Sequence, residues 1–228
     1  MEPLDERNIL VFGAGPLVGT VIPSNGRYNV STRSPLTGLI GDANSAGFWA
    51  LPLKLCGYDG LLVEGVAERP VYLHLEPGKC EFHDGDWLWG RTVSETEASL
   101  KTRHGEDTHI LSIGPGGENL VRYACTMNGL GRAAGRTGCG AVMGSKKLKA
   151  IAIKARGSIA TADPDAVREI AGEIRVSMKS SPSFKIRSRF GTPMHTTLYN
   201  AMGVLPTRND QSGVFRGARE DQRGTVAR

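Results

Sequence analysis

The sequence lacks three features that would assign it quickly to a class. No two of its 4 cysteines form a Cys-x-x-Cys pair, so their spacing supports neither a zinc site nor a complete iron–sulfur cluster. No apolar run approaches the ~18 residues of a membrane span. No secretory signal is visible either, which predicts free thiols in a reducing compartment. We therefore expect a cytoplasmic protein with no membrane partner.

Histidine is scarce, and its spacing matches no metal-ligand motif. The 5 histidines are His74, His83, His104, His109 and His195. His74 and His83 are expected to face each other across a hairpin as a surface pair. Ser34, Ser45 and Cys139 have no evident base partner, so the sequence predicts no catalytic triad.

Glycine, by contrast, is abundant at 30 of 228 residues, roughly twice its usual share. The excess lies in the first two-thirds of the chain, which predicts many turns and close backbone approaches. The net charge is +5, and basic residues concentrate after Lys179. No nucleic-acid motif accompanies them, so we expect a solvated or packing surface and no nucleic-acid partner.

The densest glycine segment begins at residue 132 and ends in the apolar run 148–153. It contains Gly135, Gly138, Gly140 and Gly144. Basic residues flank it: Arg132, Arg136, Lys146, Lys147 and Lys149. Two interpretations stay open, a backbone nest that binds an anionic or flat ligand and a glycine-rich turn that only reverses the chain.

The pattern along the chain predicts an α+β fold with a β-rich, largely antiparallel sheet system. Expected strands cover residues 8–12, 27–32, 60–64, 71–75, 79–83, 108–113 and 148–154. Expected helices cover residues 48–55, 119–127 and, after a capping box, 92–103. Pro77 and Gly78 predict a hairpin turn, and residues 114–117 a loop.

Two glycine motifs invite nucleotide-binding interpretations that their context does not support. Residues 13–19 read Gly-Ala-Gly-Pro-Leu-Val-Gly after a strand, but turn-forming residues follow where a dinucleotide fold needs a helix. Residues 144–146 read Gly-Ser-Lys, the reverse of the phosphate-loop order. We expect neither site.

The character of the chain changes near Gly157. Asp163 and Pro164 predict a helix start, and apolar residues at Val167, Ile170 and Ile174 mark one face of that helix. We therefore predict a first domain over residues 1–157. The second region, residues 158–228, is predicted to be the incomplete start of a helical domain with a frayed basic tail from residue 216.

Arg27 and Asn44 each have a plain and a functional interpretation. Asn44 lies in the small-residue stretch 41–47, where it is either an ordinary turn residue or a ligand contact. Arg27 is either a strand-edge arginine or a group that holds an anion.

Many ordered segments resemble the N-terminal domain of the aldehyde ferredoxin oxidoreductase family of tungsten and molybdenum enzymes. The longer ones are Gly-Pro-Leu-Val-Gly-Thr at 15–20, Gly-Arg-Tyr-Asn-Val at 26–30, Ile-Gly-Pro-Gly-Gly-Glu-Asn-Leu at 113–120, Arg-Ala-Ala-Gly-Arg at 132–136 and Gly-Ala-Val-Met-Gly-Ser-Lys at 140–146. The resemblance covers residues 8–217. It implies a β-rich domain that forms a base for two pterins.

The resemblance also implies a bis-pterin cofactor with tungsten or molybdenum, a nearby [4Fe–4S] cluster, and aldehyde oxidation to acids with ferredoxin as acceptor. Arg27 corresponds to a position between a pterin and the cluster. The backbone carbonyls of Asn44 and Ala133 correspond to magnesium ligands. The candidate cofactor-binding residues are Arg27, Asn44, Ser45, Ala46, Gly47, Arg132, Ala133, Ala134, Gly135 and Arg136.

The sequence departs from the family pattern in several places. Ala46 and Gly131 replace a glycine and a histidine common in the family. The cluster-binding Cys-x-x-Cys-x-x-x-Cys is expected beyond the chain's end, so we expect no iron–sulfur ligand and no catalytic residue here. The expected partners are ferredoxin, the missing C-terminal part (if need be as a separate chain) and, as an open alternative, a second copy. A non-catalytic cofactor-binding or assembly subunit, or an inactive remnant, is the competing hypothesis.

Overall fold

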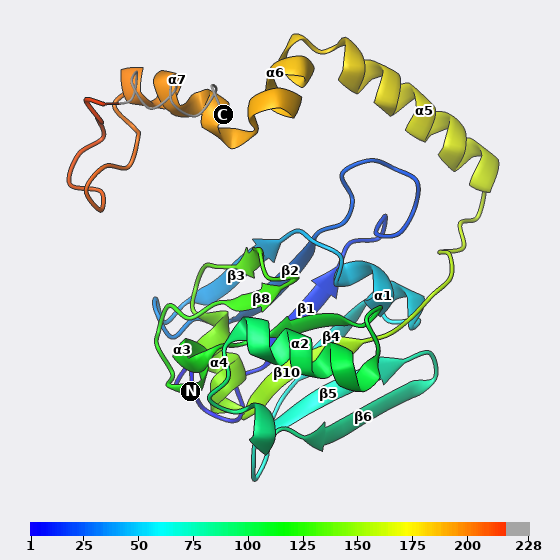
Figure 1. The fold of residues 1–228 in the computed structure, drawn as a ribbon, viewed down its shortest axis with the longest axis vertical. Coiled ribbons are helices and arrows are strands. Elements are labelled where there is room, and N and C mark those ends of the chain that lie inside the picture. The colour runs from blue at the N-terminus through cyan, green and yellow to red at the C-terminus, as the bar shows by residue number, and fades with distance from the viewer. Residues whose placement is uncertain (218–228) are drawn as a thin grey trace. The chain divides into compact units, whose positions relative to one another are not determined.

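The computed structural model describes residues 1–217. The chain forms two compact units, Met1–Val167 and Arg168–Arg228, which are drawn together in Figure 1. The division between the units falls inside a helix, ten residues after the boundary predicted at residue 157, and that boundary stays a prediction. Nearly all of the tail predicted to be frayed lies outside the described residues.

The first unit contains a four-stranded antiparallel sheet, here called sheet A. Its spatial order is β3-β2-β1-β4. The strands are β1 (Leu10–Ala14), β2 (Tyr28–Arg33), β3 (Ile40–Ser45) and β4 (Gly60–Val63). Turns and bends fill residues 16–24 after β1, so the helix that a dinucleotide fold requires does not follow this strand.

The second sheet, sheet B, has six strands in the order β6-β5-β10-β7-β8-β9. Within the described residues, β5 and β10 form its one parallel pair. The strands are β5 (Val71–Glu76), β6 (Lys79–Asp84), β7 (His109–Ser112), β8 (Thr126–Asn128), β9 (Arg132–Ala134) and β10 (Leu148–Ile153). The prediction of an α+β fold with largely antiparallel sheets is therefore confirmed.

Short helices connect and cover the two sheets. In the first unit they are α1 (Ala50–Leu55), η1 (Asp86–Leu88), α2 (Val93–His104), α3 (Pro115–Glu118) and α4 (Cys139–Ser145). The predicted capping box begins α2: the Thr92 side chain accepts a hydrogen bond from Glu95 N, and Glu95 Oε2 accepts one from Thr92 N. Within residues 1–217, no helix is long and apolar enough to cross a membrane.

Two apolar clusters bury the faces of sheet B. The larger one joins both sheets to α1 and α4 and contains Phe12, Trp49, Val142 and Ile151. The smaller one packs Leu100 of α2 onto the other face of the sheet, against Ala150 and Ala152. All six residues of β10 are consequently buried, which explains why five of them are apolar instead of alternating with polar residues, the exception being Lys149.

Three local predictions were wrong. Residues 114–117 are not a loop, since α3 covers most of them. The helix predicted at 119–127 is absent: Leu120 has a positive φ of 56°, Ala124 O accepts from Gly140 N, and β8 starts at Thr126. Residues 41–47 are not a tight loop, because β3 occupies most of them. In each case contacts with distant segments override the local pattern.

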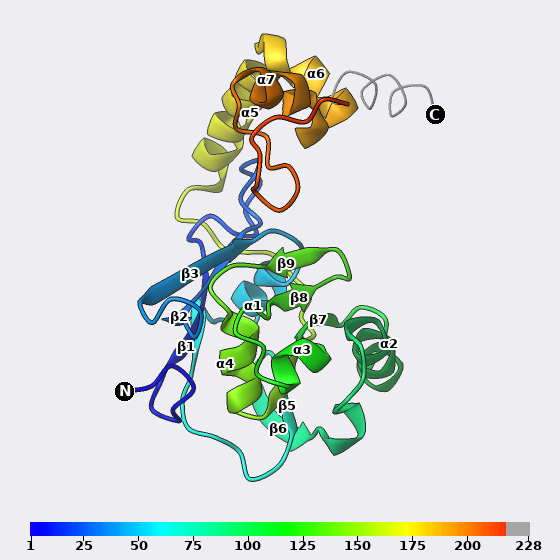
Figure 2. The same cartoon turned by 90° about the vertical axis from the view of Figure 1, so that its left-hand side faces the viewer.

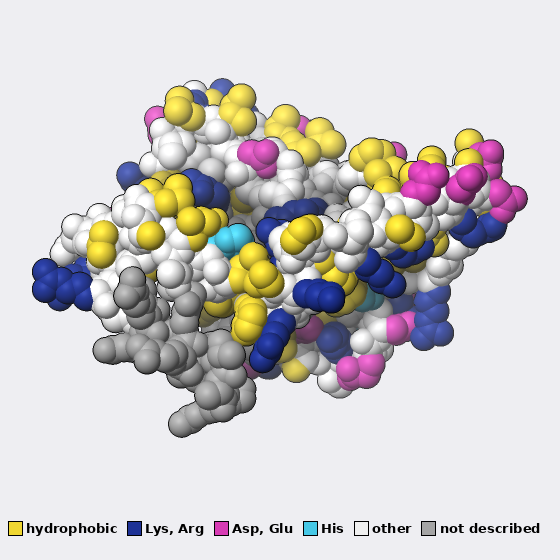
Figure 3. Space-filling view, turned by 90° about the horizontal axis from the view of Figure 1, so that it is seen from above, with side chains coloured by type: hydrophobic (Ala, Val, Ile, Leu, Met, Phe, Trp, Pro, Cys, Tyr) yellow, Lys and Arg dark blue, Asp and Glu magenta, His cyan; other side chains and the backbone are white. Residues whose placement is uncertain are grey.

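The second unit is helical. Its helices are α5 (Pro164–Ser180), which starts in the first unit, α6 (Pro182–Phe190), η2 (Thr192–His195) and α7 (Thr196–Ala201). Asp163 caps α5, since its Oδ1 accepts from Asp165 N and Ala166 N. In the described part of this unit, Ala171 is the one buried apolar residue. Many other apolar side chains lie at the molecular surface (Figure 3).

Candidate functional site

The first two residues of the predicted site contact each other on sheet A. Arg27 directly precedes β2, and Asn44 lies on β3 opposite Asn29. Arg27 Nε donates to Asn44 Oδ1, and Asn44 Nδ2 donates to Asn29 Oδ1. Arg27 and Asn44 are exposed. The network therefore orients a cationic and an amide side chain at a surface that a ligand can reach.

Asn29 belongs to this network, although the sequence analysis did not select it. It is half-buried, and its Nδ2 lies 3.4 Å from Asp42 Oδ2. The alternating burial of β2 places Asn29 on the face opposite to Tyr28 and Val30. The alternation of apolar and polar residues in β2 was the sequence signal that could have identified Asn29, because it places Asn29 away from the apolar face of the strand.

The second part of the predicted site lies on β9, at the edge of sheet B. Arg132 and Ala133 are exposed, whereas Ala134 is buried. Within residues 1–217 the guanidinium groups of Arg132 and Arg136 have no hydrogen-bond or carboxylate partner. A Cβ added at Gly135 would meet only Ala133 Cβ, at 3.8 Å. This segment therefore offers unpaired cations and accessible backbone.

The two parts of the predicted site lie against each other. Strand β9 contacts β3 (Figure 2). A Cβ at Gly47 would lie 3.3 Å from Arg132 Cγ, and one at Gly26 would lie 3.4 Å from Gly47 O. Segments that are ~100 residues apart in sequence thus meet beside Gly47. No described contact connects Arg136 to this group, and the cofactor-binding role of all these residues stays a prediction.

Buried Asn128 connects the two sheets at this point. Its Nδ2 donates to Tyr28 Oη at 2.8 Å, Ser45 Oγ at 3.3 Å and Ala46 O at 3.2 Å. Asn128 also pairs with Arg132 in the β8–β9 register. Burial raises the pKa of Tyr28 to about 12, so its hydroxyl stays protonated near neutral pH.

The later glycines of the glycine-rich segment serve internal packing. A Cβ at Gly138 would lie 1.9 Å from Arg122 O, one at Gly140 2.4 Å from Cys125 O, and one at Gly144 2.0 Å from Gly117 O. Helix α4 therefore packs directly on neighbouring backbone. The ligand-nest interpretation fails for these three residues and stays open only for the exposed part around Gly135.

Two of the flanking lysines, Lys146 and Lys149, are likewise buried and bonded to other parts of the chain. Lys149 is fully buried, where its Nζ contacts Glu118 Oε1 and donates to Arg91 O at 2.8 Å. Lys146 donates to Glu6 O at 3.0 Å and Gly65 O at 3.1 Å. Burial lowers the pKa of both ammonium groups. Neither lysine is available to a bound phosphate.

None of the predicted site residues is an acid, a histidine, a lysine or a cysteine, although the exposed carboxylate of Asp42 lies beside them in contact with Asn29. Cys139 is buried beneath the site, and its Sγ donates to Ala134 O at 3.2 Å. Burial raises the pKa of this thiol, which keeps it in the unreactive protonated form. The described part of the chain has no group of three or more His, Cys, Asp or Glu side chains that could hold a metal ion. The arrangement is suited to binding and orienting a ligand.

The histidines predicted to form a surface pair are instead part of a cluster beneath α2. The His74 and His83 rings lie 5.9 Å apart, and His74 is only 5% exposed. His104 of α2 stacks on His74 at 3.9 Å, and its Nε2 lies 3.0 Å from Tyr72 Oη. Burial lowers the pKa of His104 to about 4 and also lowers that of His74.

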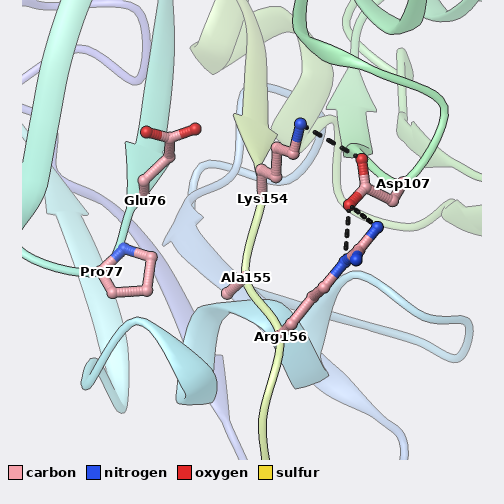
Figure 4. A pocket seen from close by; sticks show the side chains of 6 residues that line it. All are labelled: Glu76, Pro77, Asp107, Lys154, Ala155 and Arg156. Atoms are coloured by element: carbon pink, nitrogen blue, oxygen red, sulfur yellow. Dashed lines mark hydrogen bonds and ion pairs between the residues drawn. The ribbon is translucent and has the colours of Figure 1, made fainter.

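A polar surface hollow lies elsewhere on the first unit, where β5 and β10 end (Figure 4). Asp107 faces two cations there: its Oδ1 lies 3.3 Å from Lys154 Nζ and its Oδ2 2.8 Å from the Arg156 guanidinium. Both cations already have an internal partner. None of the predicted site residues lines this hollow.

Comparison with known proteins assigns the chain to a family. Residues 1–155 match the family "Aldehyde ferredoxin oxidoreductase, N-terminal domain". The chain belongs to the aldehyde ferredoxin oxidoreductase family, as the sequence resemblance had predicted.

Individual relatives agree with this assignment. A tungsten-containing aldehyde ferredoxin oxidoreductase of Thermococcus kodakarensis is 46% identical over 224 residues, which are 96% of this chain and 36% of that protein. A protein of the same description from Pyrococcus furiosus is 44% identical and covers 100% of this chain, which spans 38% of it. The chain thus spans little more than a third of these relatives.

A solved structure shares the fold. It is the active site complex BamBC of benzoyl coenzyme A reductase with 1,5-dienoyl-CoA, and it superposes with a TM-score of 0.76 at 36% sequence identity. The match covers 78% of this chain and 27% of the other.

Proposed function

We propose that this chain supplies the cofactor-binding base of a tungsten–pterin oxidoreductase. One observation carries the proposal: strand β3, which carries Asn44 and its partner Arg27, contacts strand β9, and Gly47 lies beside exposed Arg132. A pterin cofactor has phosphate groups and flat polar rings. Such a ligand is too large for one loop, so several segments must meet on it.

The chemistry of the exposed groups fits this ligand. The unpaired guanidiniums of Arg132 and Arg136 provide planar, bidentate donors for phosphate. Open backbone at Gly135 permits the close approach of a flat ring. The fully packed part of the same segment, from Gly138 onwards, has no room for either.

The fit extends to the proposed magnesium ion. Strand β3 is the edge of sheet A, and β9 is the edge of sheet B. Edge strands leave part of their carbonyl groups without a partner strand, and carbonyl oxygen is a ligand that magnesium accepts. The family resemblance, rather than this geometry, assigns the backbone carbonyls of Asn44 and Ala133 as its ligands. Ser45, Ala46, Gly47 and Ala134 complete the cofactor-binding set.

We further propose aldehyde oxidation to carboxylic acids, with ferredoxin as electron acceptor, as the activity of the complete enzyme. Tungsten is the metal that the names of the relatives give; molybdenum is the alternative. When bound, the metal–pterin group supplies the two-electron chemistry. The residues of this chain hold and orient it, and Arg27 lies toward the proposed [4Fe–4S] cluster.

The cluster ligands and the substrate pocket are assigned to the part of the enzyme that this chain does not contain. No two of its cysteines have cluster spacing. The chain alone is therefore expected to show no aldehyde-dependent viologen reduction. A second candidate function is a non-catalytic subunit that only binds the cofactor, because the predicted site residues are arginines, small residues and amide or hydroxyl groups suited to binding. A cytoplasmic location and self-association belong to the proposal as well.

Metal and pterin analysis tests the proposal. The protein is purified anaerobically from its natural host, and tungsten, molybdenum and pterin are measured per chain. The expected result is stoichiometric pterin with one of the two metals, reduced at least about tenfold by Arg132→Ala because a charged hydrogen-bond partner is lost. Absence of pterin and of both metals would refute the proposal. A co-purifying chain that confers aldehyde oxidation would exclude the non-catalytic alternative.

A further inference from the structure

Asn128 lies where the two walls of the proposed cofactor-binding surface meet, yet it cannot itself contact a ligand. It is 2% exposed and ends β8 of sheet B. The acceptors of its Nδ2 are Tyr28 Oη, Ser45 Oγ and Ala46 O, which belong to sheet A and the loop that follows it. One buried amide therefore bonds to three groups that are 82–100 residues away in sequence.

The oxygen of the same amide fixes the neighbouring loop. Gly47 has a φ of +122°, and a Cβ there would lie 2.1 Å from Asn128 Oδ1. Only glycine accommodates both the backbone angle and the approach of the amide. The added Cβ would also lie 3.3 Å from Arg132 Cγ. The loop that follows β3 therefore packs against the Asn128 side chain and lies next to Arg132.

We propose that Asn128 is a positioning residue that sets the geometry between the Asn44–Gly47 wall and the Arg132–Gly135 wall before the cofactor binds. This inference rests on the proposed function. The side chain of Asn128 donates to Ser45 and Ala46, and its backbone pairs with Arg132 across β8 and β9, so this one residue joins the two walls. A ligand that bridges the two walls then binds without first having to order them.

The directional hydrogen bonds of the Asn128 amide can fix the relative position of the two sheets, whereas the apolar core between them cannot. Apolar contacts between the sheets resist separation but tolerate small shifts of one sheet against the other. A buried amide nitrogen whose acceptors lie on the other sheet favours one arrangement, because a shift leaves buried polar atoms unsatisfied. Ser45 is adjacent to Asn44, so the hydrogen bond to Ser45 also positions the Asn44–Gly47 wall.

Three variants separate positioning from general stability. Asn128→Leu keeps the number and branching of the side-chain heavy atoms and removes every hydrogen bond of the amide. Tyr28→Phe removes one of the three acceptors and leaves the ring contact with Trp49. Leu100→Ala is the control, because Leu100 lies in the smaller apolar cluster beneath α2, away from these contacts. All are made in the full chain, and conditions are adjusted until their global stabilities match.

Hydrogen exchange of the backbone amides provides the first measurement. At matched global stability, we expect Asn128→Leu to accelerate exchange at residues 44–47 and 132–135 about tenfold relative to Leu100→Ala, the size expected when a buried hydrogen bond is lost. Tyr28→Phe should give a smaller acceleration at the same residues, and it carries the test if Asn128→Leu does not fold. Equal exchange in the amide variants and the Leu100→Ala control would overturn the inference.

The second measurement is the tungsten, molybdenum and pterin content of the same variants isolated from the cofactor-producing host. Asn128→Leu and Tyr28→Phe should lose cofactor in the order of their exchange effects, whereas Leu100→Ala should retain it. Retention in all variants would overturn the inference. A wild-type chain without pterin would instead refute the proposed function, while the exchange measurement would still decide whether Asn128 positions the two walls.

Discussion

Two halves of one glycine-rich segment have opposite surroundings. Around Gly135 the backbone is exposed, and Arg132 and Arg136 have no partner. From Gly138 to Gly144 every glycine faces backbone of another segment at a distance that excludes a side chain. Glycine density alone therefore does not identify a ligand site. The distinction lies in whether the space above each glycine is open or already filled by the protein.

The largest loss of stability is expected when a glycine of the packed half is replaced by a residue with a side chain. In Gly144→Ala the new Cβ would lie 2.0 Å from the carbonyl oxygen of Gly117, and backbone cannot rotate away as a side chain can. We predict a loss in the free energy of unfolding of about 4 kcal/mol or more, among the largest that single substitutions cause. Urea unfolding measures this loss. A loss below about 1 kcal/mol would show that α3 and α4 are not packed this closely.

A somewhat smaller effect is expected from breaking the ion pair beside that contact. Glu118 lies on α3, and its carboxylate contacts buried Lys149 and accepts from Gly90 N at 2.8 Å. Glu118→Gln leaves the ammonium without a counter-charge, and we predict a loss of about 3 kcal/mol in unfolding free energy. Glu118→Gln combined with Lys149→Met should recover much of it. Failure of the double variant to recover stability would contradict the pair's role.

Acid is expected to lower the unfolding free energy through His104, which lies at the packed sheet and not at the exposed face. The pKa of His104 is about 4 in the folded protein and about 6.5 when unfolded, so the unfolded state binds more protons between these values. Stability present at pH 7 is therefore lost as pH falls from 6.5 to 4. We predict a loss of about 1 kcal/mol, because partial solvent exposure screens the shift.

The control for this acid effect is His104→Phe, which retains an aromatic ring beneath α2. Its unfolding free energy should change less between pH 7 and pH 5 than that of the wild type. An unchanged pH dependence in His104→Phe would assign the acid effect to groups outside the histidine cluster.

The smallest effect on stability is expected at the exposed half. Gly135 does not have a positive φ, and a Cβ there would meet only Ala133 Cβ at 3.8 Å. Gly135→Ala should therefore change the unfolding free energy by less than about 1 kcal/mol, while it lowers the cofactor content of protein from the host. Thermal unfolding and pterin analysis of the same sample check both. A loss as large as that of Gly144→Ala would remove the distinction between the halves.

The parts of the fold that sequence predicts are those with local causes. Pro77 and Gly78 gave the β5–β6 hairpin, and Thr92 with Glu95 gave the start of α2. Strand β3 was missed because its small residues are typical of a loop. It is extended because it pairs with β2 along its length, with Gly41 packed against Thr137. Such contacts leave no periodic signal in a single sequence.

The candidate site was accessible only through resemblance. Nothing local connects Arg27, Asn44 and Arg132, and their proximity depends on how two sheets pack. Asn128 has no sequence signal, because its role depends on three partners in distant segments. The basic residues show the opposite error: Lys146 and Lys149 look like ligand contacts in the sequence and are buried structural groups.

The central claim, that the surface formed by Arg27, Asn44 and Arg132 binds the metal–pterin cofactor, is tested most directly by crystallography. Protein purified anaerobically from the host would be crystallised, and anomalous diffraction recorded at the tungsten and molybdenum absorption edges. Our account predicts one metal peak above this surface, with pterin phosphate groups within hydrogen-bond distance of Arg132. A metal or pterin bound at another surface of the first unit would contradict it.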